Sequence, residues 1–324
     1  MTYRGVVSSP PVTRPTPVVP PRAPDRRVGV VVVCVAVAVA SVVGVWALWR
    51  VFVTTESGQL VELAALRGAE YGQTQLWRVA ERVLDIVSVG FIAAVILAAM
   101  LIAVLRRRWE LALQVAVLMV GANVTTRLLK LEVFYRPELG VPESYGNTLP
   151  SGHTTAAASV SVALLLVVPP RVRPWAALLG AGYTTATGVS TLIGQWHRPS
   201  DVVAAILVVL AWGAVACALV ALTRRRAATS TGALRRVDED GNAPAGRRSL
   251  RLAVGVLLVT GAASAGVAVL SLSRTWQHLG AVPSRADQVL AYVGGATGSL
   301  MAACVAFAVL LLLRQAAAAR LPDS

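Results

Sequence analysis

Several apolar runs of 18 or more residues limit what this chain can fold into. As a helix, a run of that length crosses the roughly 30 Å of hydrocarbon in a bilayer. The composition agrees, because 56% of the residues are hydrophobic and only 14% are charged, whereas about a quarter of a soluble domain is charged. The sequence therefore predicts an all-α fold, a polytopic transmembrane helix bundle.

The apolar runs divide the chain into a core and an extension. Residues 1–27, rich in Pro and Arg, are predicted to be a disordered cytoplasmic tail. The charged segment 223–250 is predicted to be a cytoplasmic linker between a transmembrane core, 28–222, and a two-helix extension with a short C-terminal tail, 251–324. Segment 54–82 is polar and suits an amphipathic helix lying on the membrane. We expect eight spans, at about 28–53, 83–105, 111–129, 153–170, 174–195, 200–222, 251–273 and 288–313.

Basic residues predict the orientation. With both termini in the cytoplasm, twenty of the thirty Lys and Arg residues fall in cytoplasmic segments, in agreement with the positive-inside rule. Loops 130–152 and 196–200 then share the extracytoplasmic face of a multi-pass cell-membrane protein. Membrane topology explains the net charge of +14 without a nucleic-acid partner. The three cysteines lie inside apolar runs and are interpreted as buried hydrophobes: Cys34, Cys217 and Cys304.

The only lysine and two of the three histidines belong to three short stretches near these loops. Lys130 stands before Arg136-Pro137, and His153 ends the run Pro150-Ser151-Gly152-His153. His197 stands four residues before Asp201. A chain that uses Arg almost everywhere thus has its one Lys close to two of its few His.

These residue types are typical of a phosphate site. Lys130 and Arg136 place two cations at a span end, where a phosphate gains charge-assisted hydrogen bonds. Ser151 and Gly152 stand where a helix is expected to begin, and backbone N–H groups at a helix N-terminus bind anions. His153 lies on the first turn of that helix, near the same anion.

The second histidine has a carboxylate within reach. Asp201 follows His197 by four residues, and a carboxylate on one ring nitrogen makes the other a better nucleophile. Two histidines with different roles, together with cations for the phosphoryl oxygens, predict a phosphoryl-transfer site. No carboxylate or Cys/His cluster has the spacing of metal ligands, so we expect neither a metal nor a cofactor.

The three stretches resemble the motifs of the type 2 phosphatidic acid phosphatase superfamily, which are Lys-x6-Arg-Pro, Pro-Ser-Gly-His and Ser-Arg-x5-His-x3-Asp. The resemblance covers about 83–222 and implies a six-helix core, to which two C-terminal transmembrane helices are added. It implies that His197 is the nucleophile that forms a phosphohistidine, that Asp201 orients it, and that His153 protonates the leaving alcohol. It also implies a set of phosphate ligands: Lys130, Arg136, Ser151, Gly152 and Ser190.

The sequence departs from this pattern at two places. Five residues, not six, separate Lys130 from Arg136, a shift that the flexible Lys stem can absorb. Thr191 replaces the Arg of the third motif, and loss of one bidentate cation costs a few kcal/mol of binding or transition-state stabilisation. Three arginines expected on the same face are candidate substitutes: Arg198, Arg127 and Arg274.

The function that the resemblance implies is hydrolysis of a lipid phosphate or pyrophosphate monoester at the outer membrane face. Phosphatidic acid, phosphatidylglycerol phosphate and polyprenyl phosphates are the candidate substrates by family. A lipid headgroup phosphotransferase with the same phosphohistidine, and a non-catalytic relative weakened by Thr191, remain open. So do the oligomeric state and the role of the last two spans, which either pack on the core or dimerise through Gly294-Gly295.

Overall fold

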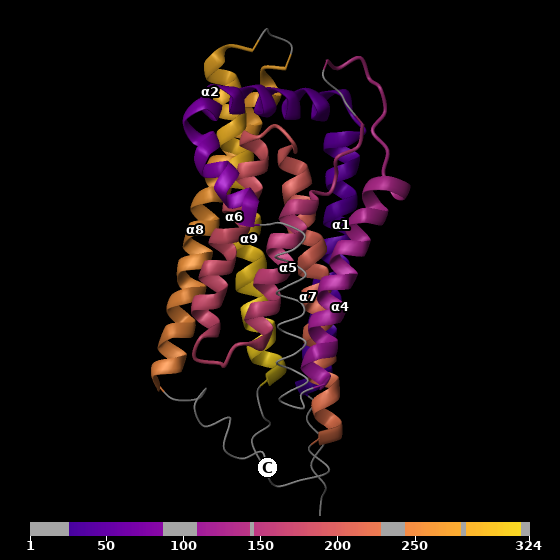
Figure 1. Cartoon of the computed structure of the whole chain (residues 1–324), viewed down its shortest axis with the longest axis vertical. Helices are drawn as coiled ribbons and strands as arrows, with labels where there is room; N and C mark the ends of the chain where they lie inside the picture. The colour runs from indigo at the N-terminus through magenta and orange to yellow at the C-terminus, as the bar shows by residue number, and fades with distance from the viewer. Residues whose placement is uncertain (1–25, 87–108, 143–145, 228–243, 280–282, 319–324) are drawn as a thin grey trace, which may run out of the picture.

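The computed structural model describes residues 26–86, 109–142, 146–227, 244–279 and 283–318. Over these residues the predicted all-α fold is confirmed, since the chain forms helices and no strand (Figure 1). Short π-helical turns, Trp49–Val53 and Leu129–Val133, continue α1 and α4. The α-helices are α1 Arg26–Leu48, α2 Glu56–Ile86, α4 Trp109–Leu128, α5 Gly152–Val167, α6 Arg173–Ile193, α7 Pro199–Ala227, α8 Pro244–Gln277 and α9 Arg285–Ala318.

Fewer helices qualify as membrane spans than the eight predicted. Most of the predicted span 83–105 lies outside the described residues, as do most of the N-terminal tail and linker. Helix α5 has 16 residues, fewer than the roughly 20 that a span needs, and α6 carries several buried Thr and Ser in its second half. Five described segments are long and apolar enough to cross a membrane: Val28–Val53, Glu110–Val133, Pro199–Leu222, Gly246–Gln277 and Arg285–Ala318.

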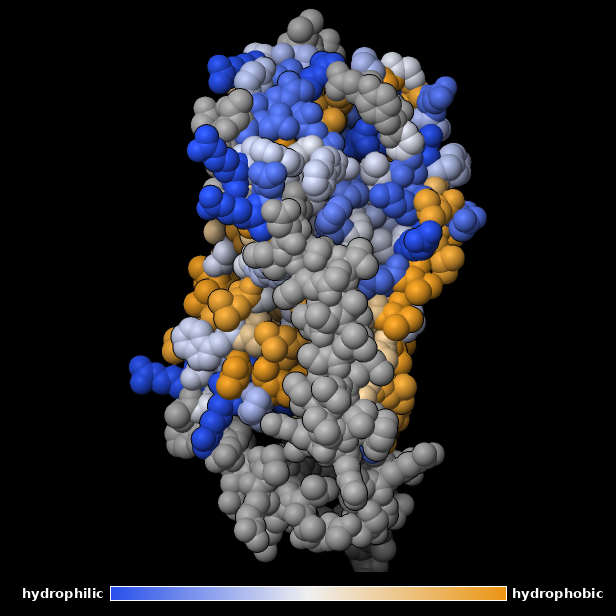
Figure 2. Space-filling model, viewed as in Figure 1, coloured by the Kyte–Doolittle hydropathy of each residue, from blue (hydrophilic) through white to orange (hydrophobic). Residues whose placement is uncertain are grey.

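The surface of the bundle fits a multi-pass membrane protein. Hydrophobic side chains gather around its middle, and hydrophilic ones gather at the upper end (Figure 2). Large apolar side chains on α1 and α8, such as Val32 and Val259, are exposed. A contiguous apolar surface of this kind marks a membrane or protein interface.

Helix α2 lies across one end of the bundle, next to the loops that lead into α5 and α7 (Figure 1). We call this end the site end. The sequence predicted that this segment lies on the membrane, but α2 packs on α6 and α9. Its apolar face, with Ala64 and Ala65, meets Ala291 of α9, and its polar Gln59 and Glu62 are also buried. The amphipathic face therefore covers protein, because the end of the bundle offers it an apolar partner.

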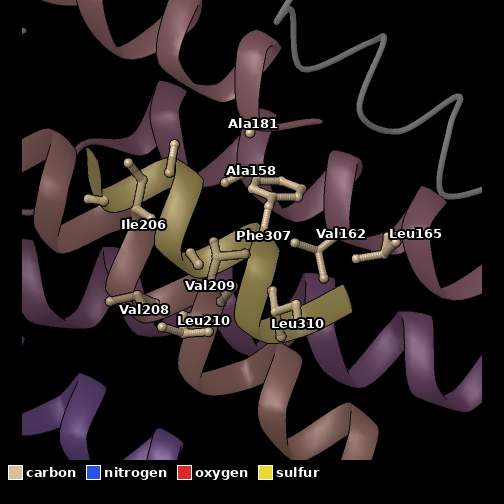
Figure 3. Packing of buried hydrophobic residues seen from close by; sticks show 14 of the residues in the cluster. Ala158, Val162, Leu165, Ala181, Ile206, Val208, Val209, Leu210, Phe307 and Leu310 are labelled. Carbon is tan, nitrogen blue, oxygen red and sulfur yellow. The ribbon is translucent and has the colours of Figure 1, made fainter. Parts of the chain in front are cut away.

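Helix α9 belongs to the core of the bundle. Its Phe307 and Leu310 pack among side chains of α5, α6 and α7 (Figure 3). Two glycines leave room for them: a Cβ on Gly180 would lie 2.4 Å from the Phe307 ring, and one on Gly213 would lie 2.7 Å from Leu310. The last helix thus packs directly on the helices that carry the motifs.

The glycine pair considered for dimerisation serves contacts within the chain. A Cβ on Gly294 would lie 2.7 Å from Ser271 of α8, and one on Gly295 would lie 2.4 Å from Pro199 at the start of α7. Both glycines permit close helix packing inside this bundle. Gly295 also places α9 directly beside the turn that follows His197.

Candidate active site

The first motif spans the end of one helix and the loop after it. Lys130 lies in the π-helical turn that ends at Val133, and Arg136 follows in the loop. The Asn147 amide donates to the carbonyl oxygens of Lys130, Phe134 and Leu149 at 3.1, 3.2 and 3.0 Å. This side chain ties the loop into one piece and fixes where Lys130 and Arg136 emerge.

The second motif begins α5, as predicted. The Ser151 hydroxyl caps the helix by accepting from the Thr154 N–H at 3.3 Å, and the Ser151 N–H donates to the Asp201 carbonyl at 3.0 Å. These bonds make Ser151 a link between α5 and α7. The N–H groups of Gly152 and His153 have no partner among the described residues, and a Cβ added at Gly152 would meet nothing within 4 Å. An anion can therefore approach the two free N–H groups at this helix terminus.

The third motif pairs a histidine with a carboxylate. His197 Nδ1 lies 3.0 Å from Asp201 Oδ2, and the two side chains are 6% and 1% exposed. Asp201 Oδ2 also accepts from the Arg198 N–H at 3.0 Å. Because an ionised carboxylate only accepts hydrogen bonds, Nδ1 carries the ring proton and Nε2 keeps its lone pair. The geometry agrees with the predicted pairing of His197 with Asp201.

The two histidines face each other across the site end. The ring centroids of His153 and His197 are 6.4 Å apart. The Trp196 ring lies 5.5 Å from His153, and the Trp77 ring of α2 lies 5.9 Å from Trp196. The charge of Lys130 acts on His153, so the lysine is close to this ring. The structure therefore brings Lys130 and both histidines together, with an aromatic row beside them.

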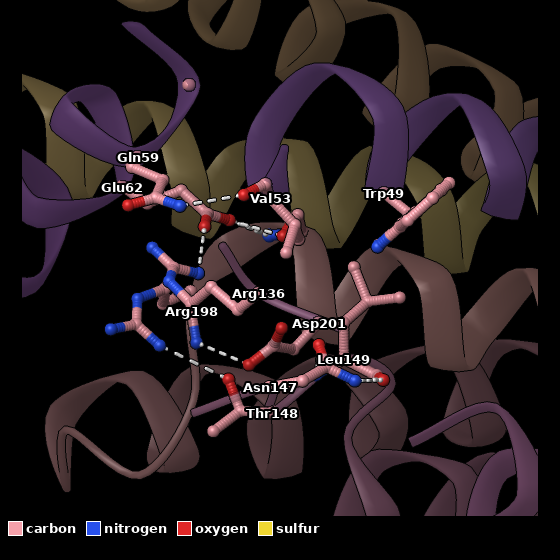
Figure 4. A network of polar contacts seen from close by, with 12 residues as sticks. Trp49, Val53, Gln59, Glu62, Arg136, Asn147, Thr148, Leu149, Arg198 and Asp201 are labelled. Carbon is pink, nitrogen blue, oxygen red and sulfur yellow. Dashed lines mark hydrogen bonds and ion pairs between the residues drawn. The ribbon is translucent and has the colours of Figure 1, made fainter. Parts of the chain in front are cut away.

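Two buried arginines and a glutamate lie next to the histidine pair. Arg136 Nη1 is 3.4 Å from Glu62 Oε2, and Arg198 Nη1 donates to the Thr148 hydroxyl at 3.3 Å (Figure 4). Burial, and then the charge of Arg198, lower the pKa of Arg136, so the two guanidinium groups are close together. Arg198 thus lies near the arginine that the first motif predicts to be a phosphate ligand.

Glu62 is the residue of this cluster that the sequence analysis missed. It is 2% exposed, and its Oε1 accepts from the N–H and the hydroxyl of Ser200. Burial, and then the charge of Asp201, raise the pKa of Glu62 to about 7, although Ser200, Arg136 and Arg198 oppose the rise. The available signal was Gln59 and Glu62, three residues apart on one face of a helix otherwise lined by Leu and Ala.

Other candidate residues lie apart from this cluster or turn away from it. Arg127 is exposed on α4 beside the exposed Val124 and Leu128, where an Arg anchors a helix at headgroup level. Arg274 is exposed on α8. The Thr191 hydroxyl donates to the Gly188 carbonyl of its own helix at 2.7 Å.

Ser190 is buried at the end of α6, one turn before Gly194. Among the described residues, no group of three or more His, Cys, Asp or Glu side chains is placed to hold a metal ion.

A comparison with protein families adds an independent finding. Residues 112–226 match the model of the PAP2 superfamily. The match includes all three motifs, whereas Glu62 and α9 lie outside it. Comparisons with curated proteins and with solved structures found no match.

Proposed function

We propose that this chain, of which residues 112–226 match the model of the PAP2 superfamily, is a membrane phosphatase that hydrolyses a lipid phosphate or pyrophosphate monoester through a phosphohistidine. The match supports a membrane phosphatase, because the superfamily is typically one of phosphatases. The observation that carries the proposal further is the 3.0 Å contact of His197 with Asp201, opposite His153.

In the first step His197 attacks phosphorus. The Nε2 lone pair forms the N–P bond while the bond from phosphorus to the ester oxygen breaks. Protonated His153 gives its proton to the departing alkoxide, which leaves as the lipid alcohol. Asp201 stabilises the positive charge that develops on the His197 ring, because it accepts the Nδ1 proton throughout.

In the second step water regenerates the enzyme. His153, now neutral, takes a proton from a water molecule as its oxygen attacks phosphorus. The N–P bond breaks, inorganic phosphate is released, and His197 returns with its lone pair on Nε2. One histidine thus serves as acid and then as base. Burial, and then the charges of His197 and Lys130, lower the pKa of His153 in the empty site. A phosphate bound beside the ring opposes this effect, because a negative charge favours the protonated form.

The surrounding donors are suited to the phosphoryl oxygens. The backbone carbonyl of Lys130 accepts from Asn147, but its ammonium has no hydrogen bond or ion pair with the other described residues and is available to an anion. The free N–H groups of Gly152 and His153 lie at the N-terminus of α5, the positive end of the helix dipole, where they can also bind the phosphate. We assign Arg136 and Arg198 to the phosphate as guanidinium ligands. Arg198 then supplies the cation that Thr191 does not, which argues against a non-catalytic relative.

The position of the site favours an amphiphilic substrate. The site lies at one end of an apolar bundle, where a lipid would present its headgroup. With both termini in the cytoplasm, as the basic residues predict, this end faces outward. The headgroup chemistry fits phosphatidic acid, phosphatidylglycerol phosphate and polyprenyl phosphates alike.

The test is phosphate release by the full-length protein in detergent, from a panel of lipid phosphates and pyrophosphates in the presence of a chelator. We expect release that His197→Ala abolishes and that His278→Ala leaves unchanged. His278 is a matched control, because it belongs to none of the three motifs and is exposed just after α8, where its Nδ1 lies 2.7 Å from the Arg274 carbonyl. Headgroup transfer to an acceptor alcohol without free phosphate would instead identify a transferase, and no turnover of any lipid would contradict the proposal.

A further inference from the structure

Glu62 reaches the site from α2, outside the part of the chain that matches the superfamily. Its carboxylate accepts the N–H of Ser200 at 3.4 Å and the Ser200 hydroxyl. Ser200 lies on the first turn of α7, three residues after His197 and directly before Asp201. A carboxylate is stabilised at such a terminus by the helix dipole.

The same carboxylate is the acidic partner of the buried arginines. Arg136 lies 3.4 Å from it, and the charges of Arg198 and Asp201 also act on it. Two guanidinium groups held together away from water repel each other unless an anion is near. Among the described acids of this cluster, Asp201 is engaged with His197, whereas Glu62 forms an ion pair with Arg136.

The neighbouring contacts fix α2 in this place. Gln59, one turn before Glu62, donates to the Val53 carbonyl at 2.8 Å (Figure 4). It also donates to the Pro137 carbonyl at 3.0 Å. Pro137 directly follows Arg136. The helix, the loop and the start of α7 are therefore joined around one buried carboxylate.

We propose that Glu62 is a positioning residue of the phosphate site. When no anion is bound, its carboxylate is the counter-ion that holds Arg136 and Arg198 together. When an oxyanion is bound, the negative charge of Glu62 repels it. This inference rests on the proposed function in so far as the site takes a phosphate. It adds to that function a control on affinity, since the site binds an oxyanion best when Glu62 carries a proton.

The sign of the pH effect follows from the charges. Burial raises the pKa of Glu62 to about 7, so at pH 6 the group is mostly neutral and at pH 8 mostly ionised. The groups that face it are Arg136, Arg198, Asp201 and the Ser200 hydroxyl. An oxyanion bound to the two arginines meets an additional negative charge at pH 8, and its affinity falls.

The experiment measures equilibrium binding of tungstate to the detergent-solubilised protein at pH 6 and pH 8. Tungstate is chosen because it remains a dianion around neutral pH, so its own charge does not change. Glu62→Gln keeps the size of the side chain and an acceptor for Ser200 but removes the charge. Glu56→Gln removes an equal charge from an exposed position on the same helix and is the matched control.

We expect Glu62→Gln to bind tungstate about tenfold more tightly than the wild type at pH 8, from the repulsion between two charges a few ångströms apart. At pH 6 the two proteins should agree within about twofold, and Glu56→Gln should follow the wild type at both pH values. Protonation of the histidines affects both proteins alike, so it cancels from the ratio of their tungstate affinities at a given pH. A ratio that is the same at pH 6 and pH 8 would overturn the proposal.

A second variant tests positioning. Glu62→Ala removes the acceptor of Ser200 as well as the charge, so the link from α2 to the start of α7 is lost. We expect kcat to fall at least tenfold in this variant, while Glu62→Gln, which keeps an acceptor for Ser200, retains most of it. Equal kcat values for the two variants would overturn the positioning role. A wild-type protein that binds no tungstate would instead refute the phosphate site itself, which separates failure of the proposed function from failure of this inference.

Discussion

Phe307 of α9 packs against Gly180 of α6, in space that any larger residue at position 180 would fill. The contact joins the last helix to the helix whose far end carries Ser190 and Thr191. The predicted C-terminal extension therefore contributes to the packing that holds the third motif.

Replacing Phe307 by Ala should destabilise the bundle by about 3–5 kcal/mol, since it leaves a cavity among α5, α6 and α7. The measurement is the midpoint of thermal unfolding in detergent. Leu312→Ala on the same helix is the control, because Leu312 is 46% exposed. Equal midpoints for the two variants would show that α9 is peripheral to the core.

Gly152→Ala should separate stability from function. The added methyl meets no described atom within 4 Å, and Ala in place of Gly in a helix gains about 0.5–1 kcal/mol. The methyl would, however, stand where we place the phosphate, so we expect KM to rise at least tenfold with unfolding temperature unchanged or higher. Gly182→Ala, an equally open position on α6, should leave KM unchanged. Normal KM in Gly152→Ala would place the phosphate elsewhere.

Arg198→Ala should lower kcat/KM by about 10²-fold, as expected for loss of a buried charge that contacts a charged ligand. Thr191→Arg should not restore the activity of this variant, because Thr191 is fully buried and its hydroxyl is bonded within α6. Steady-state kinetics on the single and double variants checks both statements. A gain of activity from Thr191→Arg in the wild-type background would mean that Arg198 does not replace the motif Arg.

Glu62 should also make stability depend on pH. Its pKa is about 7 in the folded protein against an ordinary value of 4.5, so the folded state binds the proton more tightly than the unfolded state. The stability this gives is complete below pH 4.5 and is lost as the pH rises through 7, by up to about 3 kcal/mol. The midpoint temperature of thermal unfolding should therefore fall more between pH 5 and pH 8 for the wild type than for Glu62→Gln. Parallel curves for the two proteins would contradict the raised pKa.

The sequence predicted those parts of the molecule that local patterns specify. The start of the apolar run after Pro150 located the beginning of α5 at Ser151 and Gly152, and the four-residue spacing placed His197 against Asp201. Both follow from helix geometry, which repeats every few residues. The meeting of the motifs at one end followed from counting spans, because each loop must lie at one end or the other.

Contacts that depend on how helices pack were not predictable in this way. Glu62 resembled any charge on an amphipathic helix, because the pattern cannot say whether lipid, water or protein covers the polar face. Arg127 and Arg198 were both candidates to replace the Arg missing at Thr191, and the sequence did not distinguish them. The fold leaves Arg127 exposed and buries Arg198. The place of α9 in the core was hidden for a similar reason, since an apolar helix can face lipid or protein on every side.

The most direct test of the account is to look for phosphate on His197 itself. In His153→Ala, a substrate with a good leaving group, such as p-nitrophenyl phosphate, does not need the acid in the first step, but hydrolysis still needs the base in the second. We predict that this variant accumulates one acid-labile phosphate per chain, that mass spectrometry places it on His197, and that the double variant with His197→Ala accumulates none. Continued release of phosphate without a phosphorylated intermediate in His153→Ala, or phosphate at another residue, would contradict the account.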